Sequence, residues 1–317
     1  MAVYTHISKD EIVDFLQNYK IKKLEKFEGI LEGVENSNYK IITSTEKYIL
    51  TIFEKRVNSK DLPFFINLKN HLVLKNFYCP KPVVNNFGKS INYIKNKPCV
   101  LTSYLEGKKL EDVNNDHCYQ VGSSLSLLHQ KTQDFHEFRK NSMDYNQWNK
   151  IFLKCKKVSN NNFNDLLDLI KNELSYLKKN WPKSLPKGIV HADLFKDNVF
   201  FTNNKISGFI DFYFACNDYY AYDLAITANA WCFEKNKSFN EKKFYKLIEG
   251  YQKNKDITKE EINYFQILCR GAAVRILITR LHDELFKSEN DYVEPKNPIE
   301  FADILKFHQN NNIKDCL

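Results

Sequence analysis

The sequence predicts an α+β protein of two lobes, with a small antiparallel β-sheet lobe over residues 1–104 and a mainly helical lobe over residues 105–317. Apolar strand-like stretches joined by short polar turns fill the first hundred residues, and helical spacing of apolar residues dominates afterwards. With 317 residues, 43% of them hydrophobic, the chain is long enough to bury a core in each lobe. The segment 105–108 breaks the sheet pattern and is expected to connect the lobes.

The N-terminal lobe is expected to begin with a helix over residues 9–19, because Ser8 and Glu11 form a capping box. A second helix is predicted over residues 62–78, where Cys79-Pro80-Lys81-Pro82 stops it. Five strands are predicted, of which the second and third form a hairpin, at residues 21–27, 38–43, 47–53, 91–95 and 99–104.

In the C-terminal lobe, residues 163–177 carry an apolar residue at every third or fourth position, which predicts an amphipathic helix. Thr258 and Glu261 form another capping box, which predicts the start of a long helix that runs towards Leu285.

Charge and cysteine content narrow the function class. The net charge of +8 suits an anionic ligand, but the 47 basic residues are interleaved with 39 acidic ones. No basic block marks a nucleic-acid-binding surface. The eight cysteines form no Cys-x-x-Cys pair, so they are expected to be reduced core residues. No apolar run is as long as a membrane span, which together with the polar N-terminus predicts a cytoplasmic protein without a membrane partner.

The segment from His191 to Asn198 reads His-Ala-Asp-Leu-Phe-Lys-Asp-Asn, which has the His-x-Asp-x-x-x-x-Asn spacing of a kinase catalytic loop. Asp193 can accept the proton of an acceptor hydroxyl. Residues 198–202 and 206–210 are predicted to form a hairpin that begins at Asn198 and ends at Asp211. The amide and carboxylate oxygens of these two residues suit Mg²⁺, so the pattern predicts a metal site at one edge of the hairpin. His191 is expected to orient the backbone near this site.

A nucleotide needs a covering loop and an adenine-binding segment. The connection 29–37 contains Gly33 and Asn36 and could place backbone N–H groups against phosphate oxygens, although an ordinary strand connection would look the same. By its order along the chain, the segment 102–105 is expected to offer backbone hydrogen bonds to adenine, at Ser103 and Leu105.

Residues 188–201 and 206–224 resemble the aminoglycoside-phosphotransferase-like superfamily, which shares the protein-kinase fold but phosphorylates small molecules. Ala192 stands where protein kinases carry Arg, and Asp223 follows Asp211 by only 12 positions, too few for a regulated activation loop. Within the superfamily the chain is most similar to the homoserine kinase family. The segments most specific to this family are Asp-Phe-Tyr-Phe-Ala-Cys-Asn-Asp from residue 211 and Arg-Gly-Ala-Ala from residue 270.

This resemblance implies ATP as the donor, Mg²⁺ as the metal, L-homoserine as the acceptor and Asp193 as the catalytic base. It also implies Asn198 and Asp211 as metal ligands and Asp223 as a brace of the catalytic loop. Thr51 stands at the position of the superfamily's phosphate-binding lysine on the third strand. The cation that replaces this lysine stays open, with Lys40 and Lys55 as candidates.

Homoserine is a zwitterion, so its carboxylate requires a cation, preferably Arg. Arg270, Arg275 and Arg280 lie five residues apart, and steps of about 140° around a helix prevent all three from facing solvent. An inward Arg pairs either within the fold or with the substrate. The hypothesis is that Arg275 or Arg280 binds the carboxylate, in a pocket also lined by three further residues: Asp218, Tyr222 and Trp231.

Other functions compete with this interpretation. A choline or ethanolamine kinase would need an acidic and aromatic pocket, and an aminoglycoside kinase would need many carboxylates near the C-terminal helices. A non-catalytic nucleotide-binding protein is favoured only by Thr51. The sequence leaves the oligomeric state open.

Overall fold

The structure is a computed structural model that describes residues 4–31, 36–54, 57–159, 161–287 and 294–314. Contacts divide the chain into two compact units, which are described separately. Unit 1 contains Met1–Gly107 and Ser207–Tyr213, and unit 2 contains Lys108–Ile206 and Phe214–Leu317. The short segment that carries Asp211 therefore belongs to unit 1, although it lies late in the chain.

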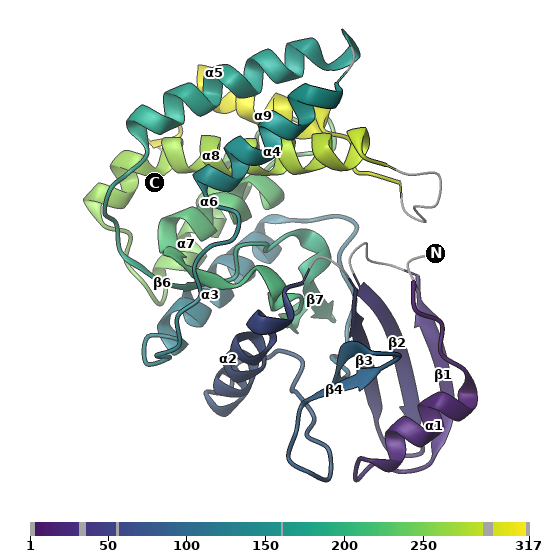
Figure 1. Ribbon diagram of the computed structural model, residues 1–317. Helices are drawn as coiled ribbons and strands as arrows, with labels where there is room; N and C mark the ends of the chain where they lie inside the picture. Colours follow the sequence, from purple (N-terminus) through teal and green to yellow (C-terminus); the bar gives the residue numbers. More distant parts are fainter. Residues whose placement is uncertain (1–3, 32–35, 55–56, 160, 288–293, 315–317) are drawn as a thin grey trace. The chain divides into compact units, whose positions relative to one another are not determined.

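Unit 1 is built on a five-stranded antiparallel sheet of order β1-β2-β3-β5-β4 (Figure 1). The predicted α+β fold class is confirmed, and the hairpin of the second and third strands is present. Strand ends differ from the prediction by up to three residues; the strands are β1 (Leu24–Ile30), β2 (Asn36–Thr43), β3 (Lys47–Phe53), β4 (Ile91–Ile94) and β5 (Lys97–Ser103). The helical segments are α1 (Lys9–Gln17), the 3₁₀ turn η1 (Ser59–Asp61) and α2 (Leu62–Leu74).

The two faces of β3 pack against different partners. Alternate residues Tyr48, Leu50 and Ile52 are buried in a core with Ile12 and Leu16 of α1, so α1 covers this face of the sheet. The predicted capping box of α1 is present. The Ser8 side chain accepts from the backbone N–H of Glu11, and the Glu11 side chain accepts from the backbone N–H of Ser8. Because side chains alternate along a strand, Thr51 and Phe53 point to the opposite face.

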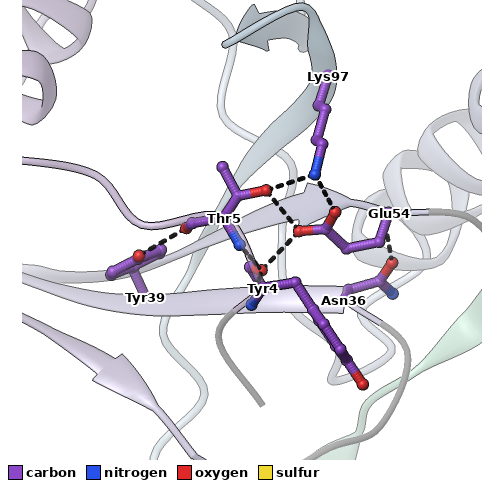
Figure 2. A network of polar contacts seen from close by, with 7 residues as sticks. Tyr4, Thr5, Asn36, Tyr39, Glu54 and Lys97 are labelled. Carbon is purple, nitrogen blue, oxygen red and sulfur yellow. Dashed lines mark hydrogen bonds and ion pairs between the residues drawn. The ribbon is translucent and has the colours of Figure 1, made fainter. Parts of the chain in front are cut away.

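A polar network ties the N-terminal segment to the sheet (Figure 2). Glu54, directly after β3, forms an ion pair with Lys97, and its Oε1 accepts from the Ser37 hydroxyl at 2.6 Å and the Thr5 hydroxyl at 2.7 Å. Burial raises the pKa of Glu54, but these donors outweigh it and the pKa is lowered. The backbone N–H of Glu54 donates to Asn36 Oδ1 at 3.4 Å. The start of β2 is thereby fixed to the end of β3.

Unit 2 is mainly helical, as predicted, with a small β component near the catalytic loop (Figure 1). β6 (Lys187–Val190) pairs antiparallel with β9 (Cys216–Tyr219), a strand that the sequence did not predict. The predicted hairpin after the catalytic loop is present as β7 (Val199–Thr202) and β8 (Lys205–Phe209). The helices are α3 (Asn115–Lys131), α4 (Tyr145–Val158), α5 (Asn164–Asn180), α6 (Tyr220–Trp231), α7 (Glu241–Gln252), α8 (Lys259–Leu285) and α9 (Ile299–Asn310).

Helix α8 is the central element of unit 2 and packs against α4, α5, α6 and α9 (Figure 1). It begins at the predicted capping box of Thr258 and Glu261. Among the described residues, no helix is both long enough and apolar enough to cross a membrane. All seven cysteines that can be placed are buried and unbridged, as predicted.

Helices α3 and α7 approach each other closely because both carry glycine at the crossing point. A Cβ on Gly122 would lie 2.0 Å from the Leu247 carbonyl oxygen, and one on Gly250 would lie 2.0 Å from the Tyr119 carbonyl oxygen. No other residue fits these positions without moving a helix backbone. The close crossing fixes the position of α3. This helix carries His129, which contacts Asp223 next to the catalytic loop.

Candidate active site

The predicted catalytic loop lies between two short strands of unit 2. Strand β6 ends at Val190, the loop follows, and the 3₁₀ turn η3 (Lys196–Asn198) leads into β7. The partner of β6 is β9, which continues directly into α6. This connection brings the first turn of α6, and with it Asp223, against the start of the loop.

Ala192 has a φ of +61°, a left-handed conformation that is uncommon for a residue with a Cβ. Both peptide groups around it are held by buried charged side chains. Asp223 accepts from the backbone N–H of His191 at 2.7 Å and of Ala192 at 2.8 Å, and Arg275 Nη1 donates to the Ala192 carbonyl. Strained backbone of this kind persists only where its surroundings fix it, and it is concentrated at functional sites.

Asp223 is fully buried and is itself supported by a histidine. His129 of α3 places Nε2 2.9 Å from Asp223 Oδ2 and Nδ1 2.9 Å from the Tyr251 hydroxyl. Burial raises the pKa of Asp223, but the hydrogen bond and charge of His129, with the backbone donors, lower it below its usual value. The predicted brace by Asp223 is confirmed. His129 was missed, because nothing local links it to a residue 94 positions later.

Arg275 is the inward-facing arginine of α8, with only 2% of its surface exposed. Besides its bond to the Ala192 carbonyl, Nη2 lies 3.8 Å from Asp193 Oδ1. Its guanidinium also lies 5.2 Å from the centre of the Phe214 ring. Arg275 therefore holds both the strained peptide and the carboxylate that follows it.

Asp193 and Asn198 lie side by side. Asn198 Nδ2 donates to the Asp193 carbonyl oxygen at 2.8 Å and to its carboxylate at 3.2 Å. Because the amide nitrogen makes these contacts, the amide oxygen Oδ1 points away from them and is available as a ligand. A hard oxygen donor of this kind fits Mg²⁺.

Asp211, the second predicted metal ligand, belongs to unit 1. Its φ is +60°, and its side chain is exposed. Aspartate tolerates this conformation better than most residues, and the carboxylate oxygens again suit Mg²⁺. Joint metal binding by Asn198 and Asp211 stays a prediction.

The predicted nucleotide-binding residues lie in unit 1. Gly33 is outside the described residues. Asn36 is buried and anchors the end of the covering segment to Glu54 (Figure 2). The Ser103 hydroxyl accepts from the Lys81 backbone at 2.9 Å, and the Leu105 side chain lies next to Gly208. Their roles towards a nucleotide stay predictions.

Three of the predicted acceptor-pocket residues lie within unit 2, where Trp231 and Tyr222 are buried and Asp218 is partly buried. Trp231 is fully buried and its Nε1 donates to the Leu194 carbonyl at 2.9 Å, so it supports the catalytic loop. Tyr222 packs against Trp148 and Trp181. Asp218 accepts from Asn141 Nδ2 at 2.6 Å and from the Tyr219 N–H at 2.7 Å, and burial raises its pKa.

The other two arginines of α8 have carboxylate partners. Arg270 forms a two-pronged pair with Glu173, with both N···O distances at 2.7 Å. Arg280 Nη1 lies 2.6 Å from Glu300 Oε2 and also donates to the Asn297 carbonyl at 3.1 Å. As the spacing predicted, the three side chains point in different directions.

Arg280 lines a pocket of about 410 Å³ beside the end of the catalytic loop. The loop contributes Phe195, Lys196 and Asp197, and Asp197 is paired with Lys296 at 2.9 Å. The walls carry both signs of charge; the charged residues are Lys109, Lys196, Asp197, Glu234, Lys235, Lys237, Arg280, Lys296 and Glu300. A pocket of this volume with mixed charge fits a small polar ligand.

Comparisons with known proteins identify the family of this chain. The model of the phosphotransferase enzyme family matches residues 26–254. Curated relatives include the homoserine kinase of Sinorhizobium medicae, which is 42% identical over 309 residues, or 98% of this chain and 95% of the relative. The homoserine kinase of Bartonella tribocorum is 43% identical over 312 residues, or 98% of each chain.

Solved structures share the fold at low sequence identity. A spectinomycin phosphotransferase has a TM-score of 0.74 and 14% identity, with 99% of this chain and all of that chain covered. The choline kinase of Cryptosporidium parvum has a TM-score of 0.65 and 15% identity, with 97% of each chain covered. The predicted protein-kinase-like fold is confirmed.

The catalytic-loop pattern, the predicted fold and the relatives over nearly the full length lead to the same assignment. The predicted enzyme class, a small-molecule kinase, is confirmed, and the chain belongs to the phosphotransferase enzyme family.

Proposed function

We propose that this enzyme transfers the γ-phosphoryl group of ATP, with Mg²⁺ as cofactor, to the hydroxyl of L-homoserine. The observation that carries the proposal is the similarity at 42–43% identity, over 98% of the chain, to proteins named homoserine kinase. The solved neighbours that act on choline or spectinomycin are only 14–15% identical, so they support the fold and not the acceptor.

In this proposal Asp193 accepts the proton of the acceptor hydroxyl. Arg275 keeps the Asp193 carboxylate in place through its contact at 3.8 Å, while Asp223 holds the preceding backbone. Asn198 and Asp211 would hold Mg²⁺, which would supply positive charge against the phosphates. Positioning and electrostatics account for most of the catalysis in phosphoryl transfer, and these residues supply both.

For the acceptor carboxylate, the geometry favours Arg280 over Arg275. Arg275 is enclosed and already bonded to the Ala192 carbonyl. Arg280 lines the mixed-charge pocket, and its present partner, Glu300, is half-exposed. Because Glu300 is partly exposed, a substrate carboxylate can share or replace it at the Arg280 guanidinium.

The acceptor is tested by ADP release from MgATP with a panel of hydroxyl compounds: L-homoserine, L-serine, L-threonine, choline, ethanolamine and an aminoglycoside. Saturable turnover is expected with L-homoserine, at a kcat/KM at least about 100-fold above that of the other compounds, because the pocket must pair both charges of the substrate. Preferential turnover of choline or of the aminoglycoside would contradict the assigned acceptor while leaving the phosphotransferase chemistry in place.

Arg280→Met is expected to raise the KM for L-homoserine by about 10- to 100-fold, because a charge-assisted hydrogen bond to a carboxylate contributes about 1.5–3 kcal/mol. The KM for ATP should change less than about twofold. Steady-state kinetics with each substrate varied checks this. Lys306→Met, an exposed cation on the neighbouring helix α9, is the matched control. An unchanged KM for L-homoserine would exclude Arg280 as the carboxylate ligand.

A further inference from the structure

One charged residue of unit 1 lies where an apolar one is expected. Lys69 is 4% exposed and lies on α2 among the buried residues Phe65, Leu68 and Leu72. A lysine is almost never this buried unless an anion is near it. Its position therefore indicates a function that requires an ammonium group inside the lobe.

Lys69 faces the side of the sheet on which Thr51 lies. Tyr213 links the two elements: its ring is 5.0 Å from that of Phe53 on β3 and 5.5 Å from that of Phe65 on α2. The Lys69 ammonium lies 5.6 Å from the centre of the same ring. Thr51, two residues before Phe53 on the same strand face, donates to Asn38 at 2.8 Å. The strand thus has threonine where a lysine was expected, and the facing helix supplies a lysine instead.

Asp211 supplies negative charge to this lysine. Burial lowers the pKa of Lys69 to about 8, and the Cys79 thiol and the Asp211 carboxylate act in the opposite direction. Burial raises the pKa of the Cys79 thiol to about 12, so this thiol stays neutral. Asp211 is thus the charged group of the two.

In the proposed function Asp211 binds Mg²⁺, so its negative charge would no longer offset the positive charge of Lys69. A carboxylate that binds Mg²⁺ has its charge compensated by the dication. The buried Lys69 would then lack this compensation, and a further anion would be needed to offset its charge. The phosphate oxygens of a nucleotide bound at that metal are such an anion.

We propose that Lys69, on helix α2, binds the phosphates of the nucleotide in place of a lysine on β3. This proposal rests on the proposed function in one respect, that the donor is a nucleotide whose Mg²⁺ is bound by Asp211. It does not depend on the identity of the acceptor. The sequence left open which cation binds the phosphates. The proposal assigns this role to Lys69 in place of Lys40 and Lys55.

The test is calorimetric binding of MgADP and of adenosine to the whole protein, without acceptor. Lys69→Met keeps an unbranched side chain of similar length but removes the charge. MgADP binding is expected to weaken about 10- to 100-fold, and adenosine binding to change less than about twofold, because only the former contains phosphates. Lys69→Arg should recover part of the loss. Lys60→Met, an exposed cation just before α2, should bind both as the wild type does.

Each other outcome counts against the proposal. Unchanged MgADP binding in Lys69→Met, or an equal loss for MgADP and adenosine, would leave Lys69 a purely structural residue. If Lys40→Met instead weakened the binding of MgADP but not of adenosine, the phosphate-binding residue would be Lys40 on β2. Circular dichroism verifies folding, and Lys69→Gln replaces Lys69→Met if the latter is unfolded. Failure of the wild type to bind MgADP would overturn the ATP donor itself, whereas acceptor specificity for another alcohol would leave the Lys69 result intact.

Discussion

Asp193→Asn is expected to lower kcat for phosphoryl transfer by about 10²- to 10⁴-fold, the usual contribution of a positioned general base. An amide of the same shape cannot take up the acceptor proton. It can still accept from Asn198 Nδ2, which lies 3.2 Å from the present carboxylate, so the local geometry should be kept. Nucleotide affinity is therefore expected to stay within about twofold. Steady-state kinetics and calorimetry on the same preparation measure both quantities.

The matched control for this prediction is Asp165→Asn, which changes an exposed carboxylate in the first turn of α5. Its kcat should equal that of the wild type. A decrease of less than about threefold in Asp193→Asn would mean that another group, or water alone, accepts the proton. A large decrease accompanied by lost nucleotide binding would instead indicate that Asp193 acts through the nucleotide site.

Asp223→Asn is expected to lower the free energy of unfolding by about 3–5 kcal/mol, the cost of removing one partner from a buried charged network. Asp223 accepts two backbone N–H groups and contacts His129. The amide of Asn keeps one acceptor oxygen, but the NH₂ that replaces the other oxygen cannot accept from any of these donors. The catalytic loop loses part of its support around Ala192, so kcat should also fall by about 10- to 100-fold. Urea denaturation and kinetics at pH 7 test the two effects.

The pH dependence gives a second readout for Asp223. Its pKa is lowered on folding, so its contribution to stability is complete above the ordinary value of 3.8. That contribution is lost only as the pH falls through the lower folded value. The difference in stability between wild type and variant should therefore persist at pH 5. Asp168→Asn, exposed on α5, serves as the control. A variant within about 1 kcal/mol of the wild type would show that Asp223 is not the brace.

Local sequence signals predicted much of the fold. The capping boxes at Ser8 and Thr258 define helix starts in the structure because the cap bonds form within one helical turn. The hairpin after the catalytic loop and the two-lobe order were also predictable from apolar alternation and short polar turns. The catalytic-loop spacing, together with the strand before it, the hairpin after it and Asp211, predicted a phosphotransferase.

What the sequence could not predict depends on contacts between distant segments. Strand β9 has only four residues, two of them polar, and its conformation follows from pairing with β6. The partner of Arg270 lies 97 residues earlier, and His129 lies 94 residues before Asp223. Lys69 did carry a local signal, since it follows Phe65 by four residues and precedes Leu72 by three, on the apolar side of its helix.

The most direct test of the proposed chemistry is ³¹P NMR of the wild type with MgATP and L-homoserine, recorded alongside Asp193→Asn. The wild type should convert ATP to ADP and to one phosphomonoester per ADP, identified as O-phospho-L-homoserine by comparison with the authentic compound. The variant should produce neither within the same time. Formation of inorganic phosphate in place of the phosphomonoester, or equal conversion by the variant, would contradict a homoserine phosphotransferase with Asp193 as its base.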